Sequence, residues 1–143
     1  MSMTDKVSEL KNWLKAFLKN KDTLTKSIVH MEEADDTIFV EYTSKKHLFI
    51  IHPHFEHKQH LLTQLESKEH PITLVTLNTK KNLLQTINWW DILIEHPNLS
   101  IYFVIPSRND KWIIHPTTHD KIIERNTLEK GLKSLAEGIG FYD

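Results

Sequence analysis

Three apolar runs with helical patterns between them constrain the fold of this chain more than any other feature. The runs are His47–Ile51, Ile72–Leu77 and Ser100–Ile105, each short and rich in β-branched or aromatic residues, as strands are. Apolar residues of 56–67 and 80–96 recur instead at helical spacing. A strand–helix–strand–helix–strand order joins its strands by right-handed crossovers, which favours parallel neighbours and an α/β fold.

The remaining segments predict what surrounds this unit. They are a helix over 5–20, a strand or helix end over 27–31, a hairpin of 37–42 with 47–51, a strand over 111–114 and a closing helix over 127–137. Residues 1–143 are therefore predicted to form a single α/β domain. We expect a three-layer mixed sheet with helices on both faces, an N-terminal helix and an antiparallel edge hairpin. The sequence leaves open whether strands 47–52 and 72–77 are parallel or antiparallel neighbours.

Composition narrows the class of protein. The chain has no cysteine, which excludes disulfides and fits a reducing, cytoplasmic location. No apolar run reaches the roughly 18–20 residues of a membrane span, so no membrane partner is expected. The net charge is −1 and only Arg108 and Arg125 are arginines, which does not favour nucleic-acid binding.

Histidines are unusually frequent between strand 47–51 and the next helical pattern. His52, His54, His57 and His60 lie within nine residues, and imidazoles suit zinc, copper or nickel. The cluster predicts either a divalent-metal site beyond the end of the strand or a solvated loop. His115 follows strand 111–114, so a metal site could combine it with His52 and His54 if the two regions converge.

Two further groups of residues are candidates for binding. Trp89 stands beside Trp90 in one helical pattern, so one of them is expected to be partly exposed, where tryptophan anchors interfaces. Trp90 fits the apolar stripe better, which leaves Trp89 as the candidate. The basic residues that could line one edge and contact phosphate are Lys45, Lys46, Lys80, Lys81 and Arg108.

One stretch resembles a known family. Leu74–Lys80, followed by Gln85 on the next helical pattern, is similar to the motif of the restriction-endonuclease-like (PD-(D/E)XK) superfamily. The resemblance implies a metal-dependent nuclease fold in which Asn78, Lys80 and Gln85 occupy the catalytic positions. Asn78 stands where the family has an acid, so the resemblance implies a degenerate member. An alternative frame places acids at Asp36 and Glu41, but Thr43 then replaces the lysine.

These observations predict two kinds of function. The first is a non-catalytic interaction domain, such as a degenerate nuclease-like subunit, that binds a protein partner or forms a homo-oligomer. The second is a metal-dependent hydrolase, such as a nuclease, that uses the His52–His60 cluster. Weak nucleic-acid binding without catalysis lies between them.

Overall fold

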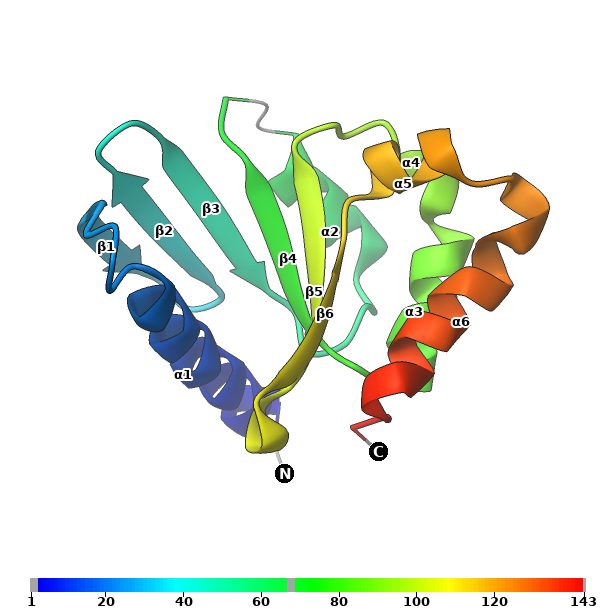
Figure 1. Cartoon of the computed structure of the whole chain (residues 1–143), viewed down its shortest axis with the longest axis horizontal. Helices are drawn as coiled ribbons and strands as arrows, with labels where there is room; N and C mark the ends of the chain where they lie inside the picture. The colour runs from blue at the N-terminus through cyan, green and yellow to red at the C-terminus, as the bar shows by residue number, and fades with distance from the viewer. Residues whose placement is uncertain (1–2, 67–68, 143) are drawn as a thin grey trace.

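The computed structural model describes residues 3–66 and 69–142, which form one mixed sheet between two layers of helices (Figure 1). The strands are β1 (Ile28–Glu33), β2 (Thr37–Tyr42), β3 (Lys46–Ile51), β4 (Ile72–Leu77), β5 (Leu99–Ile105) and β6 (Asp110–Ile114). The helices are α1 (Met3–Lys21), α2 (Lys58–Leu65), α3 (Lys80–Asn88), α4 (Trp90–Leu93), α5 (Pro116–Ile122) and α6 (Leu128–Ile139). The predicted α/β class is confirmed.

The six strands lie in the sheet in chain order. β1, β2 and β3 form an antiparallel meander, β3, β4 and β5 are parallel, and β6 is antiparallel to β5. Strands 47–52 and 72–77 are thus parallel neighbours. The predicted hairpin of 37–42 with 47–51 is confirmed, but it does not form the edge, because β1 pairs outside β2.

Each face of the sheet has its own apolar core. α1 covers one face with Leu10, Leu14 and Trp13, against side chains of β2 to β5. The other face is covered by α2, α3, α4 and α6, and its core includes Trp89, Trp90 and Trp112. β4 and β5 are buried along their whole length, which explains their continuous apolar sequence.

Two helical segments differ from the prediction. The pattern over 80–96 is divided into α3 and α4, because the backbone leaves helical geometry at Trp89, with φ −95° and ψ 8°. α5 was not predicted. It begins at Pro116, and proline fits the first position of a helix because the backbone N–H there has no partner within the helix. The helix predicted over 56–67 corresponds to α2, which spans Lys58–Leu65. Ser67, the last residue of the predicted range, lies outside the described residues. Among the described residues, no helix has the length and apolar character to cross a bilayer.

A row of polar side chains crosses three strands on the face that α1 covers. His47 Nε2 on β3 lies 2.7 Å from Thr73 Oγ1 on β4, which lies 2.7 Å from Ser100 Oγ on β5. The His47 ring also stacks on Phe49, with ring centroids 4.2 Å apart. Burial, with a smaller contribution from Lys45 and Lys21, lowers the pKa of His47 from 6.5 to about 4.

This histidine should make stability depend on pH. Because the pKa of His47 is lower in the folded protein, the unfolded chain binds more protons between pH 6.5 and about 4. The stabilisation is complete above pH 6.5 and is lost as the pH falls toward 4. In urea unfolding at several pH values, the wild type should lose about 1–3 kcal/mol more than His47→Gln. His30→Gln, at an exposed position on β1, serves as the control and should behave like the wild type. Equal acid sensitivity of the wild type and His47→Gln would contradict the prediction.

Candidate functional site at the carboxyl edge of the sheet

The carboxyl ends of the parallel strands β3, β4 and β5 lie side by side and form the carboxyl edge of the sheet, where open α/β folds commonly bind ligands. Most of the predicted site residues lie in the segments that follow these strands. The start of β2 lies at the same edge, because β2 is antiparallel to β3 and Thr37 pairs with Ile50.

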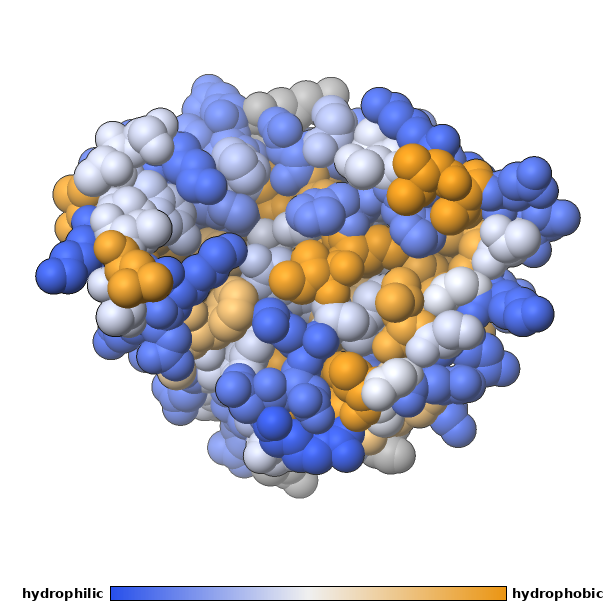
Figure 2. Space-filling model, viewed as in Figure 1, coloured by the Kyte–Doolittle hydropathy of each residue, from blue (hydrophilic) through white to orange (hydrophobic). Residues whose placement is uncertain are grey.

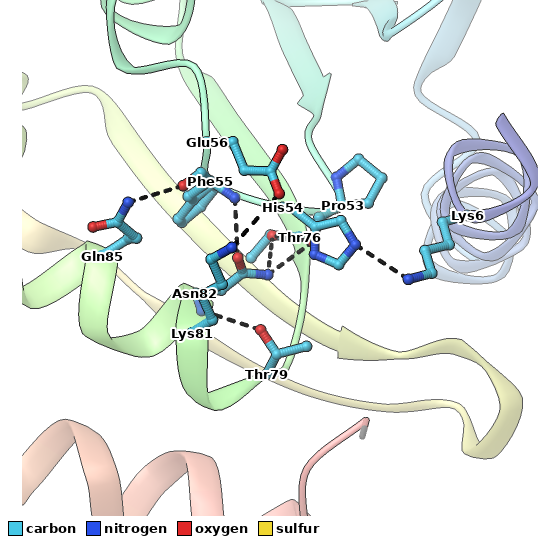
Figure 3. Close-up of polar contacts among 10 residues, drawn as sticks. All are labelled: Lys6, Pro53, His54, Phe55, Glu56, Thr76, Thr79, Lys81, Asn82 and Gln85. Atoms are coloured by element: carbon cyan, nitrogen blue, oxygen red, sulfur yellow. Dashed lines mark hydrogen bonds and ion pairs between the residues drawn. The ribbon is translucent and has the colours of Figure 1, made fainter. Parts of the chain in front are cut away.

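Asn82 is the buried centre of a hydrogen-bond network at this edge (Figure 3). Its Nδ2 donates to the carbonyl oxygens of Pro53 and Leu77, at 2.8 and 2.9 Å, and to Thr76 Oγ1 at 2.9 Å. Its Oδ1 accepts a hydrogen bond from the backbone N–H of Phe55 at 3.0 Å. One amide thus holds the loop after β3 against the end of β4.

Asn78, the position where the nuclease-like motif has an acid, is fully buried and serves packing. Its Nδ2 donates to the carbonyl oxygens of Ala136 and Gly140, at 3.1 and 2.8 Å. Its Oδ1 accepts a hydrogen bond from Trp112 Nε1 at 2.8 Å. The side chain therefore satisfies carbonyls at the end of α6, which have no partner within the helix.

The other residues of the motif also have structural partners. Gln85 Nε2 donates to the carbonyl oxygen of Phe55 at 3.2 Å. Lys80 Nζ lies 5.5 Å from the centroid of the Phe141 ring. Asn78 and Lys80 thus contact the C-terminal segment and Gln85 the loop after β3, and none of the described contacts joins the three side chains into one constellation.

The basic residues do not line one edge, so that prediction is wrong. Lys45 and Lys46 lie where β3 begins, whereas Lys80 and Lys81 follow the end of β4, which is parallel to β3. The first doublet therefore lies where the parallel strands begin, and the second lies where they end. Lys81 Nζ lies 3.7 Å from Glu56 Oε1, and both residues are drawn in Figure 3.

Arg108 is bound to its own chain. Its Nη2 donates to the carbonyl oxygen of Ile139 at 2.7 Å, and its Nε lies 3.7 Å from Asp110 Oδ2. Arg108 therefore holds the end of α6, close to Gly140.

Trp89 is buried, contrary to the expectation that it is partly exposed. Only 7% of its surface is accessible, and its ring packs 5.7 Å from that of Phe55. Both Trp89 and Trp90 can face the same core because the helix is interrupted between α3 and α4. Trp89 therefore offers no exposed anchor for an interface.

The structure brings only part of the predicted metal set together. Ligand atoms of His52, His60 and Asp36 all lie within 4.8 Å of one another. His54 belongs to another contact, since its Nε2 lies 3.2 Å from Lys6 Nζ (Figure 3). His57 precedes α2 and is not part of the three-ligand group.

His115 does not converge with His52. It follows β6, which is antiparallel to β5, and so lies where the parallel strands begin, away from the carboxyl edge. Asp36 was not among the predicted metal ligands. Its position before β2 was the available signal, because antiparallel pairing of 37–42 with 47–51 brings residue 36 next to the end of β3.

Electrostatics make His52 a potential ligand at neutral pH. Burial lowers its pKa, against the opposing effects of a hydrogen bond with Gln64 and the charge of Asp36. The imidazole is thus neutral, as a metal ligand must be. No family model, curated protein or solved structure matches this chain.

The role of Asn78 can be tested with the substitution that would complete the acid position of the nuclease-like motif. Asn78→Asp should destabilise the fold by about 3 kcal/mol or more, because a carboxylate oxygen would face the carbonyls of Ala136 and Gly140. Urea unfolding followed by circular dichroism measures this loss. The matched control is Asn88→Asp at an exposed position on α3, expected to change stability by less than about 0.5 kcal/mol. A wild-type stability for Asn78→Asp would refute the packing role.

Proposed function

We propose that this protein is a non-catalytic interaction domain that forms a homodimer through the β6 edge of its sheet. The observation that carries the proposal is the character of this edge. Within the described residues β6 pairs with β5 only, so its outer side has backbone groups available for another strand. In Figure 1, β6 runs along the front of the sheet, and Figure 2 shows apolar surface over it and toward α5 and α6.

The two edges of the sheet differ in how they are protected. β1 carries His30, Glu32 and Glu33, and its register with β2 is irregular between Ile28 and His30. Charges and irregular pairing are devices that keep edge strands from joining other strands. In β6, charges occur only in its first two residues, and the rest is Trp112-Ile113-Ile114. The β6 edge is therefore the one suited to pairing.

Exposed apolar side chains flank β6 on both sides. Trp112 and Ile114 are buried against α6, so the alternation of a strand directs Ile113 to the opposite face, where 39% of it is exposed. On the other side, Leu135 of α6 and Ile122 of α5 are 45% and 76% exposed. A second copy that extends the sheet would cover apolar groups on either side of the new strand pair.

The glycines of α6 support close approach from outside. Gly131 and Gly138 lie within the helix, where glycine costs about 1 kcal/mol relative to alanine. Apart from the chain neighbours and the nearby backbone of the helix itself, no described atom lies within 4 Å of the position that a Cβ would take at either residue. Packing within the described chain therefore gives no reason for glycine, whereas a partner lying against this helix would.

A second copy is the partner that the charge of the chain favours. A net charge of −1 produces little repulsion between identical molecules. Pairing about a two-fold axis would place β6 antiparallel to its copy and use the same apolar groups twice. The lack of cysteine fits association in the cytoplasm.

Hydrolysis through the nuclease-like motif is the alternative that these contacts support less. Asn78 and Gln85 are engaged in hydrogen bonds to the backbone, and Asn78 is fully buried. The likeness to the restriction-endonuclease-like superfamily stays a hypothesis that rests on the short motif Leu74–Lys80 and Gln85. A degenerate member of that family would be consistent with an interaction role.

Light scattering coupled to size-exclusion chromatography tests the dimer. The wild type should elute as a dimer at micromolar concentrations, and Ile113→Lys or Leu135→Lys should weaken association at least tenfold. Each substitution places a charge in the apolar surface beside β6, which a partner strand would have to desolvate. Both side chains are exposed in the single chain, so circular dichroism should be unchanged.

Val29→Lys is the matched control for this experiment. Val29 is 60% exposed on β1, the opposite edge, and its substitution should leave the dimer intact. A wild type that stays monomeric across these concentrations would refute the proposal. A dimer lost in Val29→Lys but retained in Ile113→Lys would do so as well, because it would place the interface on β1.

A further inference from the structure

Three metal-ligating side chains meet where β3 ends, and each comes from a different segment. Asp36 precedes β2, His52 follows β3, and His60 lies on α2. The backbone N–H of Ile51 donates to the carbonyl oxygen of Asp36 at 2.7 Å, which fixes the first two segments side by side. Leu61 is buried in the core, so the position of the adjacent His60 is set by the packing of α2.

The spacing of these groups suits a single metal ion. One ring nitrogen of each histidine and one carboxylate oxygen of Asp36 lie within 4.8 Å of one another, and His60 Nε2 is 3.7 Å from Asp36 Oδ2. Ligands at 2.0–2.1 Å from a tetrahedral zinc lie about 3.4 Å apart. Small side-chain adjustments would therefore complete the geometry, with no change in the backbone.

Gln64 orients two of the three ligands. Its Oε1 accepts a hydrogen bond from His52 Nε2 at 2.7 Å, and its Nε2 donates to Asp36 Oδ2 at 3.2 Å. Gln64 follows His60 by one helical turn, so both project from the same face of α2. Side chains that hold the ligands in this way are typical of metal sites and affect their affinity.

We propose that Asp36, His52 and His60 form a site for a zinc-type transition metal ion. Two imidazoles and one carboxylate favour zinc, copper, nickel or cobalt over magnesium and calcium, which prefer oxygen ligands. His60 and Asp36 have side chains that are 59% and 38% exposed, so a fourth position is open to water. The ion would connect the start of β2, the end of β3 and α2.

His60 neighbours the other two ligands without a hydrogen bond to Asp36. Its Nε2 is 3.7 Å from Asp36 Oδ2, beyond hydrogen-bond distance, and its ring is 5.8 Å from that of His52. His60 therefore lies beside Asp36 and His52 at a spacing that ligands of one shared ion would have.

The site and the β6 edge are separate features. β4 and β5 lie between β3 and β6, and none of the three ligands contributes to the dimer surface proposed above. The variant Ile113→Lys should therefore bind metal as the wild type does. Failure of one proposal would leave the other intact.

Calorimetric titration of Zn²⁺ into tag-free, full-length protein that has been stripped of metal tests the site. We expect one saturable site per chain near pH 7.5, and at least tenfold weaker binding for Asp36→Asn, His52→Ala and His60→Ala. Gln64→Ala should weaken binding about tenfold through loss of ligand orientation. Zn²⁺ should also raise the unfolding temperature of the wild type, because only the folded chain assembles the three ligands.

His60→Ala is the decisive variant, because His60 is exposed and its loss should leave the metal-free unfolding temperature unchanged. The matched control is His115→Ala, an exposed histidine at the opposite edge of the sheet, which should bind Zn²⁺ like the wild type. The proposal is overturned by the absence of saturable binding, by wild-type affinity in His60→Ala, or by loss of binding in His115→Ala.

Discussion

The structure depends on two buried asparagines that follow the central strand β4. β4 is covered by helices on both faces, so the backbone that follows it is also buried. Its N–H and C=O groups must find hydrogen-bond partners away from water, because an unpaired buried group costs about 1–3 kcal/mol. Asn82 provides such partners for the loop after β3, and Asn78 for the end of α6. Because a single amide both donates and accepts, each residue joins segments far apart in sequence that could not otherwise meet without orphaned polar groups.

This use of the β4 carboxyl end has a functional consequence. The place where an α/β sheet most often assembles a reacting centre is here filled by amide-to-backbone contacts and closed by the end of α6. Polar groups that stay accessible lie instead beside it, where Asp36, His52 and His60 converge at the end of β3. The interaction surface proposed for β6 lies at the sheet edge, beyond β5. The end of β4 thus serves packing, and the two proposed binding surfaces lie on either side of it.

Features fixed by local pattern could be predicted from the sequence, and features fixed by distant contacts could not. The apolar runs of β4 and β5 and the stripe of α1 directly reflect burial, so their prediction was confirmed. The interruption at Trp89 lets the adjacent indoles of Trp89 and Trp90 enter one core. It depends on tertiary packing, which the spacing of apolar residues along a helix does not reveal. The pairing of Asp36 with His52 and His60 likewise depends on strand register and on the placement of α2. His115 was grouped with His52 only because the direction of β6 was unknown.

The distribution of tryptophan gives the two cores separate optical reporters. Trp13 lies in the core beneath α1, whereas Trp89, Trp90 and Trp112 lie in the core on the opposite face, and none is more than 8% exposed. Indole emission shifts to longer wavelength when water reaches the ring. A chain that keeps only Trp13 and a chain that lacks only Trp13 would each follow one layer during denaturation. Coincident curves would mean that the sheet transmits the loss of one layer directly to the other.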